Sequence, residues 1–230
     1  HVPLTSSAGT NHFSTFSHIP DMPKFHLLFA LLFIVCSFSA PAQQKELERI
    51  MDHYAAVDHF NGTVLVVRKG AFLLSKSYGY SNARNKIKNS ASTIYQIGSN
   101  TKQFTAEAIL QLDSKGRLSI EDKLSKYLPN YPNADRISLK NLLTHTSGIS
   151  NYTNDSVLVR LHPDRPVTHD EILARFENKT LDFFPGTRFE YSNSNYYLLG
   201  LVIEKITHVN YEHAMRSDIL QVCDMTHSGF

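Results

Sequence analysis

The segment Ser99-Asn100-Thr101-Lys102 places an amine three residues after a hydroxyl. An unactivated serine hydroxyl is a poor nucleophile and needs a base within hydrogen-bond reach. On a helix, residues three apart lie one turn apart on the same face, so Lys102 can approach Ser99 Oγ and, when desolvated, accept its proton. Taken alone, this short pattern is more typical of an N-capping serine followed by a solvated lysine.

A tyrosine could complete such a site, because a neighbouring ammonium lowers the pKa of a phenol, which can then take the serine proton or activate a water. Four Tyr-x-Asn triplets occur, starting at Tyr80, Tyr131, Tyr152 and Tyr191. The triplets at Tyr80 and Tyr191 share the letters Tyr-Ser-Asn, so the triplet by itself does not identify the tyrosine. Position helps more, because Tyr80 closes a predicted hairpin, while Tyr131 and Tyr152 lie in proline- or Asn-rich loops.

Three longer phrases, in this order along the chain, carry a family resemblance. The run Ile97–Ala106 closely resembles the first sequence box of the class C β-lactamase and serine DD-peptidase family, which includes esterases. The phrase Leu142–Ile149 resembles the landmark between the boxes of that family. The run Phe184–Asn193 resembles the approach to its second box, Tyr-x-Asn. The similarity covers about residues 54–230.

This resemblance implies a role for each site residue. Ser99 would be the acylated nucleophile, Lys102 and Tyr191 would handle its proton, and Asn193 would donate a hydrogen bond to the substrate amide. The expected reaction is acyl transfer through a serine ester, on a β-lactam, a D-Ala-D-Ala peptide or an ester, without a cofactor. The choice among these substrates stays open. Tyr80, whose triplet has the same letters as that of Tyr191, is expected to be structural rather than catalytic.

Other nucleophile or metal sites find less support in the sequence. His145 could partner a serine, but a lone histidine is more often a packing residue, and the resemblance gives its phrase a structural role. Ser147 lacks the Gly-x-Ser-x-Gly elbow of an α/β-hydrolase triad. The chain has 12 histidines but no His-Glu-x-x-His, and a single cysteine outside the N-terminal region makes a thiolate zinc site improbable. We therefore expect no metal site.

The elements that must position these residues begin with a helix candidate, Gln43–Tyr54. The β-branched run Gly62–Arg68 predicts a buried strand, and the turn signal Lys69-Gly70 joins it to a second strand, Ala71–Tyr80, as a hairpin. A polar loop, Ser81–Ser92, follows.

Helices dominate the remainder. Ser99–Ser114 has apolar residues at helical spacing and Gly116 in the C-capping position, and Thr168 and Glu171 form a predicted capping box. Further helical pieces are predicted at residues 118–128, 137–143, 195–207 and 211–220. Together with the resemblance, this order predicts an α/β (α+β) fold of the β-lactamase/transpeptidase type. It would have an antiparallel sheet flanked by helices and a helical subdomain, without its C-terminal strands.

Residues 1–42 are expected to precede a partial hydrolase domain, 43–230. Residues 22–42 resemble a signal peptide, with a short basic start, the apolar run Leu27–Phe38 and the cleavage signal Ala40-Pro41-Ala42. The apolar run is shorter than the ~20 residues of a membrane-spanning helix, so we expect only transient membrane contact. Residues 1–21 would be an upstream extension. After cleavage Cys223 has no disulfide partner, which indicates a periplasmic or secreted bacterial protein.

The composition is that of an ordinary globular protein, and its near-neutral charge argues against highly charged partners such as nucleic acids. The 230 residues are 42% hydrophobic, enough for a sizeable core. Lys and Arg number 23 and Asp and Glu 21, so a net charge of +2 gives no reason to expect a nucleic-acid partner. We expect a small-molecule or peptidoglycan-like substrate instead.

The third box of the family, Lys-Thr-Gly or His-x-Gly on a late strand, has no clear counterpart. His227-Ser228-Gly229 imitates it, but no strand pattern precedes His227, and Met225–Phe230 resembles a family turn that follows a helix. The sequence therefore predicts a C-terminally truncated fragment that lacks sheet strands and one oxyanion donor. Two alternatives stay open: a catalytically inactive family member and a ligand-binding envelope protein.

Overall fold

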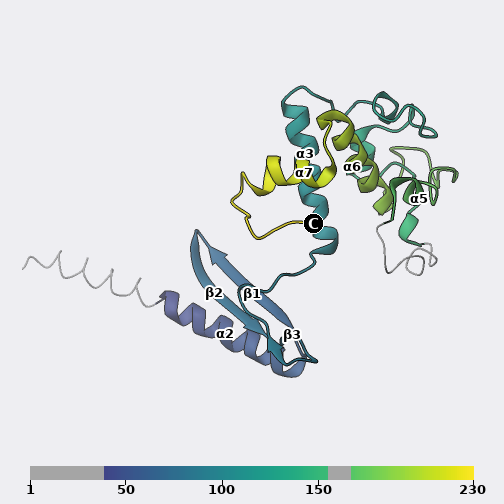
Figure 1. Cartoon of the computed structure of the whole chain (residues 1–230). Coiled ribbons are helices and arrows are strands. Elements are labelled where there is room, and N and C mark those ends of the chain that lie inside the picture. The colour runs from purple at the N-terminus through teal and green to yellow at the C-terminus, as the bar shows by residue number, and fades with distance from the viewer. Residues whose placement is uncertain (1–38, 155–166) are drawn as a thin grey trace, which may run out of the picture. The chain divides into compact units, whose positions relative to one another are not determined.

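The computed structural model describes residues 39–154 and 167–230, which fall into two compact units (Figure 1). The first unit ends at Tyr95, and the second begins at Gln96. The predicted upstream extension and most of the predicted signal peptide lie outside the described residues, so both stay predictions. Among the described helices, none combines the length and the apolar character that crossing a bilayer requires.

The first unit is built from one long helix and a hairpin (Figure 1). Helix α2 (Ser39–Val57) packs on strand β2 (Ala71–Tyr78), which pairs antiparallel with β1 (Gly62–Arg68). Lys69 and Gly70 connect the strands, both with positive φ (50° and 79°), as in the tight turns that match the right-handed twist of a hairpin. The predicted hairpin is confirmed.

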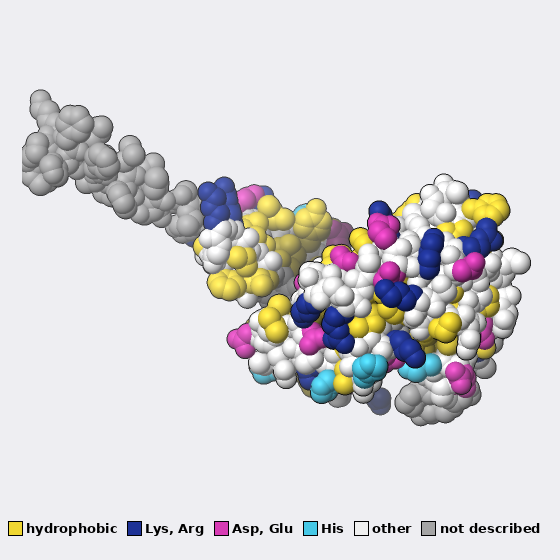
Figure 2. Space-filling model, turned by 90° about the horizontal axis from the view of Figure 1, so that it is seen from above, with side chains coloured by type: hydrophobic (Ala, Val, Ile, Leu, Met, Phe, Trp, Pro, Cys, Tyr) yellow, Lys and Arg dark blue, Asp and Glu magenta, His cyan; other side chains and the backbone are white. Residues whose placement is uncertain are grey.

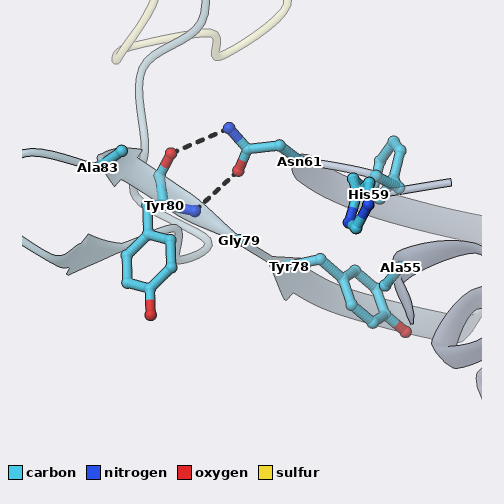
Figure 3. Close-up of a pocket in the computed structure, with 8 residues that line it drawn as sticks. Ala55, His59, Asn61, Tyr78, Gly79, Tyr80 and Ala83 are labelled. Carbon is cyan, nitrogen blue, oxygen red and sulfur yellow. Dashed lines mark hydrogen bonds between the residues drawn. The ribbon is translucent and has the colours of Figure 1, made fainter. Parts of the chain in front are cut away.

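The predicted second strand, Ala71–Tyr80, is interrupted at Gly79. The predicted polar loop that follows it contains most of strand β3 (Tyr80–Asn82) and all of strand β4 (Ile87–Lys88). Strand β3 pairs antiparallel with β4. The side chain of Asn61 holds the break: its Nδ2 donates to the Tyr80 carbonyl (3.0 Å) and its Oδ1 accepts the Tyr80 N–H (2.8 Å) (Figure 3). Asn61, Gly79 and Tyr80 are among the residues that line a cavity of about 310 Å³. Tyr80 is therefore anchored through its backbone within the first unit.

The expectation that β1 is a buried strand is wrong. In the described part of the first unit, Leu74 is the only buried apolar side chain, whereas Leu65, Val67 and Phe72 are 57%, 49% and 74% exposed. Hydrophobic side chains are accordingly visible on the surface of this unit (Figure 2). The physical reason is that a two-stranded ladder packed on one helix offers too few neighbours to cover both of its faces.

In the second unit, helix α3 (Thr101–Ser114) follows a short 3₁₀ turn, η1 (Gly98–Asn100). The helix ends at Gly116, which has φ 65°. The Gly116 N–H donates to the Asp113 carbonyl and the Arg117 N–H to the Leu112 carbonyl, both at 2.9 Å. This pair of hydrogen bonds is a Schellman cap, so the predicted helix and its glycine cap are confirmed.

Helix α6 (Asn193–Thr207) lies at the centre of the second unit. Helices α3, α4 (Leu139–Leu143) and α7 (Tyr211–Met215) all pack against it. Its inward-facing side chains are almost completely buried: Leu198, Leu199, Val202 and Ile203. Burying each such side chain contributes roughly 1.5–3 kcal/mol. This packing therefore holds α6 against its neighbours and positions its first residue, Asn193, within the unit.

Short capped helices complete the unit. Ser138 and Asn141 form a reciprocal capping box at the start of α4. The predicted capping box of Thr168 and Glu171 is confirmed and begins α5 (His169–Leu173). Two 3₁₀ turns, η2 (Leu124–Lys126) and η3 (Tyr152–Asn154), also lie in the described part of this unit.

The C-terminal segment contains turns but, within the described residues, no strand after Leu220. Helix α7 changes into a π-helical turn, η5 (Arg216–Leu220), where an uninterrupted α-helix was expected. The Ser228 N–H donates to the Met225 carbonyl (3.1 Å), so His227 lies in a turn. This agrees with the prediction that His227-Ser228-Gly229 is not the third box.

Residues 182–190 run beside the landmark phrase 145–148. The N–H groups of Asp182, Gly186 and Glu190 donate to the carbonyls of Gly148, Thr146 and His145 at 2.8, 2.8 and 2.9 Å. Gly148 has φ 78°, and a Cβ there would collide with the Phe183 carbonyl oxygen. Glycine at 148 therefore permits this close approach, which leads the chain to Tyr191.

Replacing Gly148 by alanine is expected to lower the free energy of unfolding by at least about 3 kcal/mol, because backbone strain and overpacking add. Gly116→Ala is the matched control, since Gly116 also has positive φ (65°) but open space around its Cβ position. The control should lose only about 1 kcal/mol. Urea denaturation of both variants measures the difference, and equal losses would contradict the close approach at Gly148.

Candidate active site

Ser99 lies where the 3₁₀ turn η1 passes into helix α3. Gly98, with φ 52°, makes the sharp entry into this turn. Lys102 follows one turn later on the same face, and its Nζ donates to Ser99 Oγ at 3.2 Å. The predicted juxtaposition of hydroxyl and amine is therefore present.

Tyr191 reaches Ser99 from a distant segment of the sequence. It ends the run 182–190 that pairs with the landmark phrase, and its phenolic oxygen lies 2.9 Å from Ser99 Oγ. Its ring centroid is 5.0 Å from Lys102 Nζ, within the range of a cation–π interaction. The packing of 182–190 against 145–148 thus delivers the phenol to the entrance of α3.

The Tyr-x-Asn spacing has a simple geometric reason. Ser192, between the two side chains, has extended backbone angles (φ −140°, ψ 124°). Because successive side chains of extended backbone point to opposite sides, Tyr191 and Asn193 project together while Ser192 is buried. Asn193 Oδ1 accepts hydrogen bonds from Lys102 Nζ (2.7 Å) and from the Tyr191 hydroxyl (3.2 Å). All four residues singled out from the sequence therefore meet.

The electrostatics of this cluster favour ionisation of Tyr191. Burial alone would raise the pKa of its phenol, but hydrogen bonds involving Lys102 and Ser99, together with the charge of Lys102, outweigh burial and lower it. Such a phenol is a better proton acceptor at neutral pH than an ordinary tyrosine.

His145 packs against the Tyr191 ring and accepts a hydrogen bond from the backbone of the Tyr-x-Asn triplet. Its buried ring lies 4.6 Å from the Tyr191 ring and 5.2 Å from the Tyr196 ring, measured between centroids. Its Nδ1 accepts the Ser192 N–H (3.2 Å) and faces the Asn195 amide nitrogen (3.2 Å). Burial, followed by the Lys102 charge, lowers the pKa of His145. A neutral ring is what these two donors require, because Nδ1 must offer its lone pair.

Sequence reasoning missed several contributors. Asn151 Oδ1 accepts the Asn193 backbone N–H (3.0 Å), and Thr153 Oγ1 accepts from Asn193 Nδ2 (2.9 Å). The only available signal was a run of polar residues after the landmark phrase, which reads as an ordinary loop. No group of three or more His, Cys, Asp or Glu side chains suited to a metal occurs in the described parts of the chain. Cys223 is a free, exposed thiol.

Comparison with known proteins places the chain in a family of serine hydrolases. The family model described as Beta-lactamase matches residues 47–230. The chain belongs to the beta-lactamase family, whose members are serine hydrolases.

Individual relatives agree with this assignment. Protein flp of Staphylococcus aureus is 38% identical over 195 residues, which cover 81% of this chain and 38% of that protein. A penicillin-binding protein from Bacillus halodurans is 32% identical in structure-based comparison, with TM-score 0.68, covering 80% of this chain and 55% of that one. A class C beta-lactamase solved with cefoxitin shares the fold at 23% identity, with TM-score 0.70, over 83% and 52% of the two chains.

These comparisons confirm the predicted β-lactamase/transpeptidase-like fold. The chain spans about two fifths of the length of the curated relatives it matches (41% and 38%).

Because the folded protein keeps His145 neutral and an unfolded histidine titrates near 6.5, stability should fall as the pH drops below about 6.5. His145→Asn is expected to be less stable than the wild type but to lose this part of the pH dependence. Urea denaturation between pH 7.5 and 5 measures both slopes. Identical slopes in the two proteins would show that His145 does not carry the effect.

Proposed function

We propose that the protein containing this chain hydrolyses a β-lactam, a D-Ala-D-Ala peptide or an ester through an acyl-enzyme on Ser99. The observation that carries the proposal is the convergence of Lys102 Nζ and the Tyr191 hydroxyl on Ser99 Oγ, at 3.2 and 2.9 Å. A hydroxyl with two such partners has both a proton acceptor and a positive charge beside it, as nucleophilic catalysis by serine requires.

In the proposed mechanism, Tyr191 is the proton acceptor. Lys102 donates to Ser99 Oγ and Asn193 Oδ1, so the serine proton is free to point at the Tyr191 oxygen. Ser99 Oγ attacks the carbonyl carbon as its proton passes to the ionised phenol. Lys102 stabilises the negative charge that develops on Ser99 Oγ during this transfer. The phenol then protonates the leaving group. Water later attacks the ester as its proton passes to the ionised phenol, and the phenol returns this proton to Ser99 Oγ as the acyl group leaves.

The entrance of α3 would stabilise the tetrahedral intermediate. The N–H of Ser99 lies at the positive end of the helix dipole, where an oxyanion is favoured. Asn193 Nδ2 would donate to the substrate amide. The substrate is proposed to be a small molecule or a peptidoglycan fragment met in the periplasm or outside the cell, as the predicted signal peptide suggests.

Incubation with a fluorescent penicillin should give a covalent adduct, which mass spectrometry of the digested protein locates on Ser99. Labelling should disappear in Ser99→Ala, because no other hydroxyl in the cluster has the same partners. The natural full-length product should be labelled beside the 230-residue chain. An adduct at another residue, or turnover that survives in Ser99→Ala, would overturn the proposal.

This experiment also separates the proposal from its two alternatives. A catalytically inactive relative or a ligand-binding envelope protein predicts no covalent adduct in either protein. Labelling of the longer product alone assigns the activity to the proposed site acting together with further sequence.

Tyr191→Phe is expected to slow acylation by about 10²–10⁴-fold, the range typical of a lost general base. In the wild type the acylation rate should rise with pH as the phenol ionises, at a pH below the ordinary value of 10, and the variant should lose this rise. Stopped-flow acylation across the pH range measures both effects.

Tyr80→Phe is the matched control for Tyr191→Phe. Tyr80 begins a triplet with the same letters and is equally exposed (43% for both tyrosines). It should leave the acylation rate and its pH profile unchanged. A Tyr191→Phe protein that behaves as this control does would assign the proton to Lys102 instead.

A further inference from the structure

We propose that Asn151 and Thr153 are positioning residues that set the direction of the Asn193 side-chain amide. Through it they hold Lys102 as a hydrogen-bond donor beside Ser99 and leave one amide N–H for the substrate. The catalytic consequence rests on the proposed function, whereas the orientation itself follows from the hydrogen bonds of the 3₁₀ turn η3 and its neighbours.

The first step fixes the side chain of Asn151. Its Oδ1 lies 3.0 Å from the backbone N–H of Asn193, which can only donate. The atom facing Asn193 must therefore be the oxygen. The amide nitrogen on the other side donates to Asn154 Oδ1 at 3.0 Å, which satisfies the same orientation.

The second step commits the proton of Thr153. Its hydroxyl lies 3.0 Å from Asn151 Oδ1, which can only accept, so the hydroxyl donates there. A hydroxyl has a single proton to give. Toward Asn193, which lies 2.9 Å away, Thr153 Oγ1 can therefore act only as an acceptor.

The third step follows for Asn193. Because Thr153 accepts, the amide nitrogen of Asn193 must face Thr153, and its oxygen must face the other way. That oxygen receives Lys102 Nζ at 2.7 Å and the Tyr191 hydroxyl at 3.2 Å. A flipped amide would instead present an N–H group to the ammonium, donor against donor.

The relay also apportions the two N–H groups of Asn193. One donates to Thr153 Oγ1, so one is left for an acceptor. A carbonyl oxygen of an amide-bearing substrate is an acceptor of the right kind. A simple ester without a side-chain amide would not use this N–H, so the relay should matter more for amide-bearing substrates.

The turn that carries the relay is held against α6 by further bonds. The Tyr152 N–H donates to Ser194 Oγ (3.1 Å), and the Ser194 hydroxyl donates to the Ser150 carbonyl (2.7 Å). Ser194 is fully buried. Asn151 also serves the helix directly, because it accepts an N–H of the first turn of α6, where the N-cap Ser192 makes no side-chain cap.

The test compares Thr153→Val, which keeps the shape but removes the oxygen, with Thr153→Ser, which keeps the oxygen. Acylation of the natural full-length product is measured with a penicillin, which carries a side-chain amide, and with p-nitrophenyl acetate, which does not. Thr153→Val should slow acylation by the penicillin about 10- to 100-fold and by the ester less, as expected when the amide beside the ammonium loses the partner that orients it. Thr153→Ser should remain within about 3-fold of the wild type. A valine variant as fast as the wild type, or a serine variant as slow as valine, would overturn the proposal.

A second readout does not depend on activity. In the wild type, NMR should show one side-chain amide proton of Asn193 protected from exchange, with the signal assigned by its loss in Asn193→Asp. Thr153→Val should lose this protection and Thr153→Ser should keep it, with urea denaturation confirming that both are folded. Protection that persists in Thr153→Val contradicts the relay. If the relay is present but no protein is acylated, the proposed function fails and the orientation stands.

Discussion

The hydrogen bond between Lys102 Nζ and Asn193 Oδ1, 2.7 Å long, is the interaction on which the site depends. It joins the first turn of α3 to the first residue of α6, the two helix starts that carry the candidate site residues. An ammonium without this acceptor would direct its protons elsewhere, and Ser99 Oγ would keep only the Tyr191 hydroxyl as its partner. The bond can form only because α3 and α6 pack side by side, and that packing comes from buried core side chains of the two helices, such as Ile109 and Leu199.

Two residues around the site act as hydrogen-bond acceptors, and each can do so in only one state. His145 accepts through Nδ1, which requires a neutral ring, and Asn151 accepts through Oδ1, which requires one amide orientation. Both acceptors take backbone N–H groups at the start of α6, from Ser192 and Asn193. The backbone of the Tyr-x-Asn triplet is thereby held from two sides, while its side chains remain available to Ser99 and Lys102.

Local features of the fold could be predicted well from the sequence, and long-range ones only in part. The Ser99–Lys102 pair and the Gly116 cap follow from helix geometry, which a few neighbouring residues determine. The letters of the two triplets are identical, so Tyr191 could be separated from Tyr80 only through its position along the chain and the longer phrases. The exposure of Val67 was predicted wrongly, since burial depends on which partners cover a strand. The roles of Asn151 and Thr153 were invisible, because the direction of a hydrogen bond depends on the whole chain of donors and acceptors.

The buried position of Ser192 restricts the middle letter of the triplet. Its side chain points into the protein interior, with 2% of its surface exposed, while its neighbours on both sides face the reacting groups. A bulky residue here would have to displace the interior or rotate the backbone, and rotation would swing the phenol and the amide apart. A bulky residue at position 192 would therefore disable the candidate site even with the letters Tyr-x-Asn intact. A small residue there is necessary without being sufficient, since Tyr80-Ser81-Asn82 has the same letters and lies elsewhere.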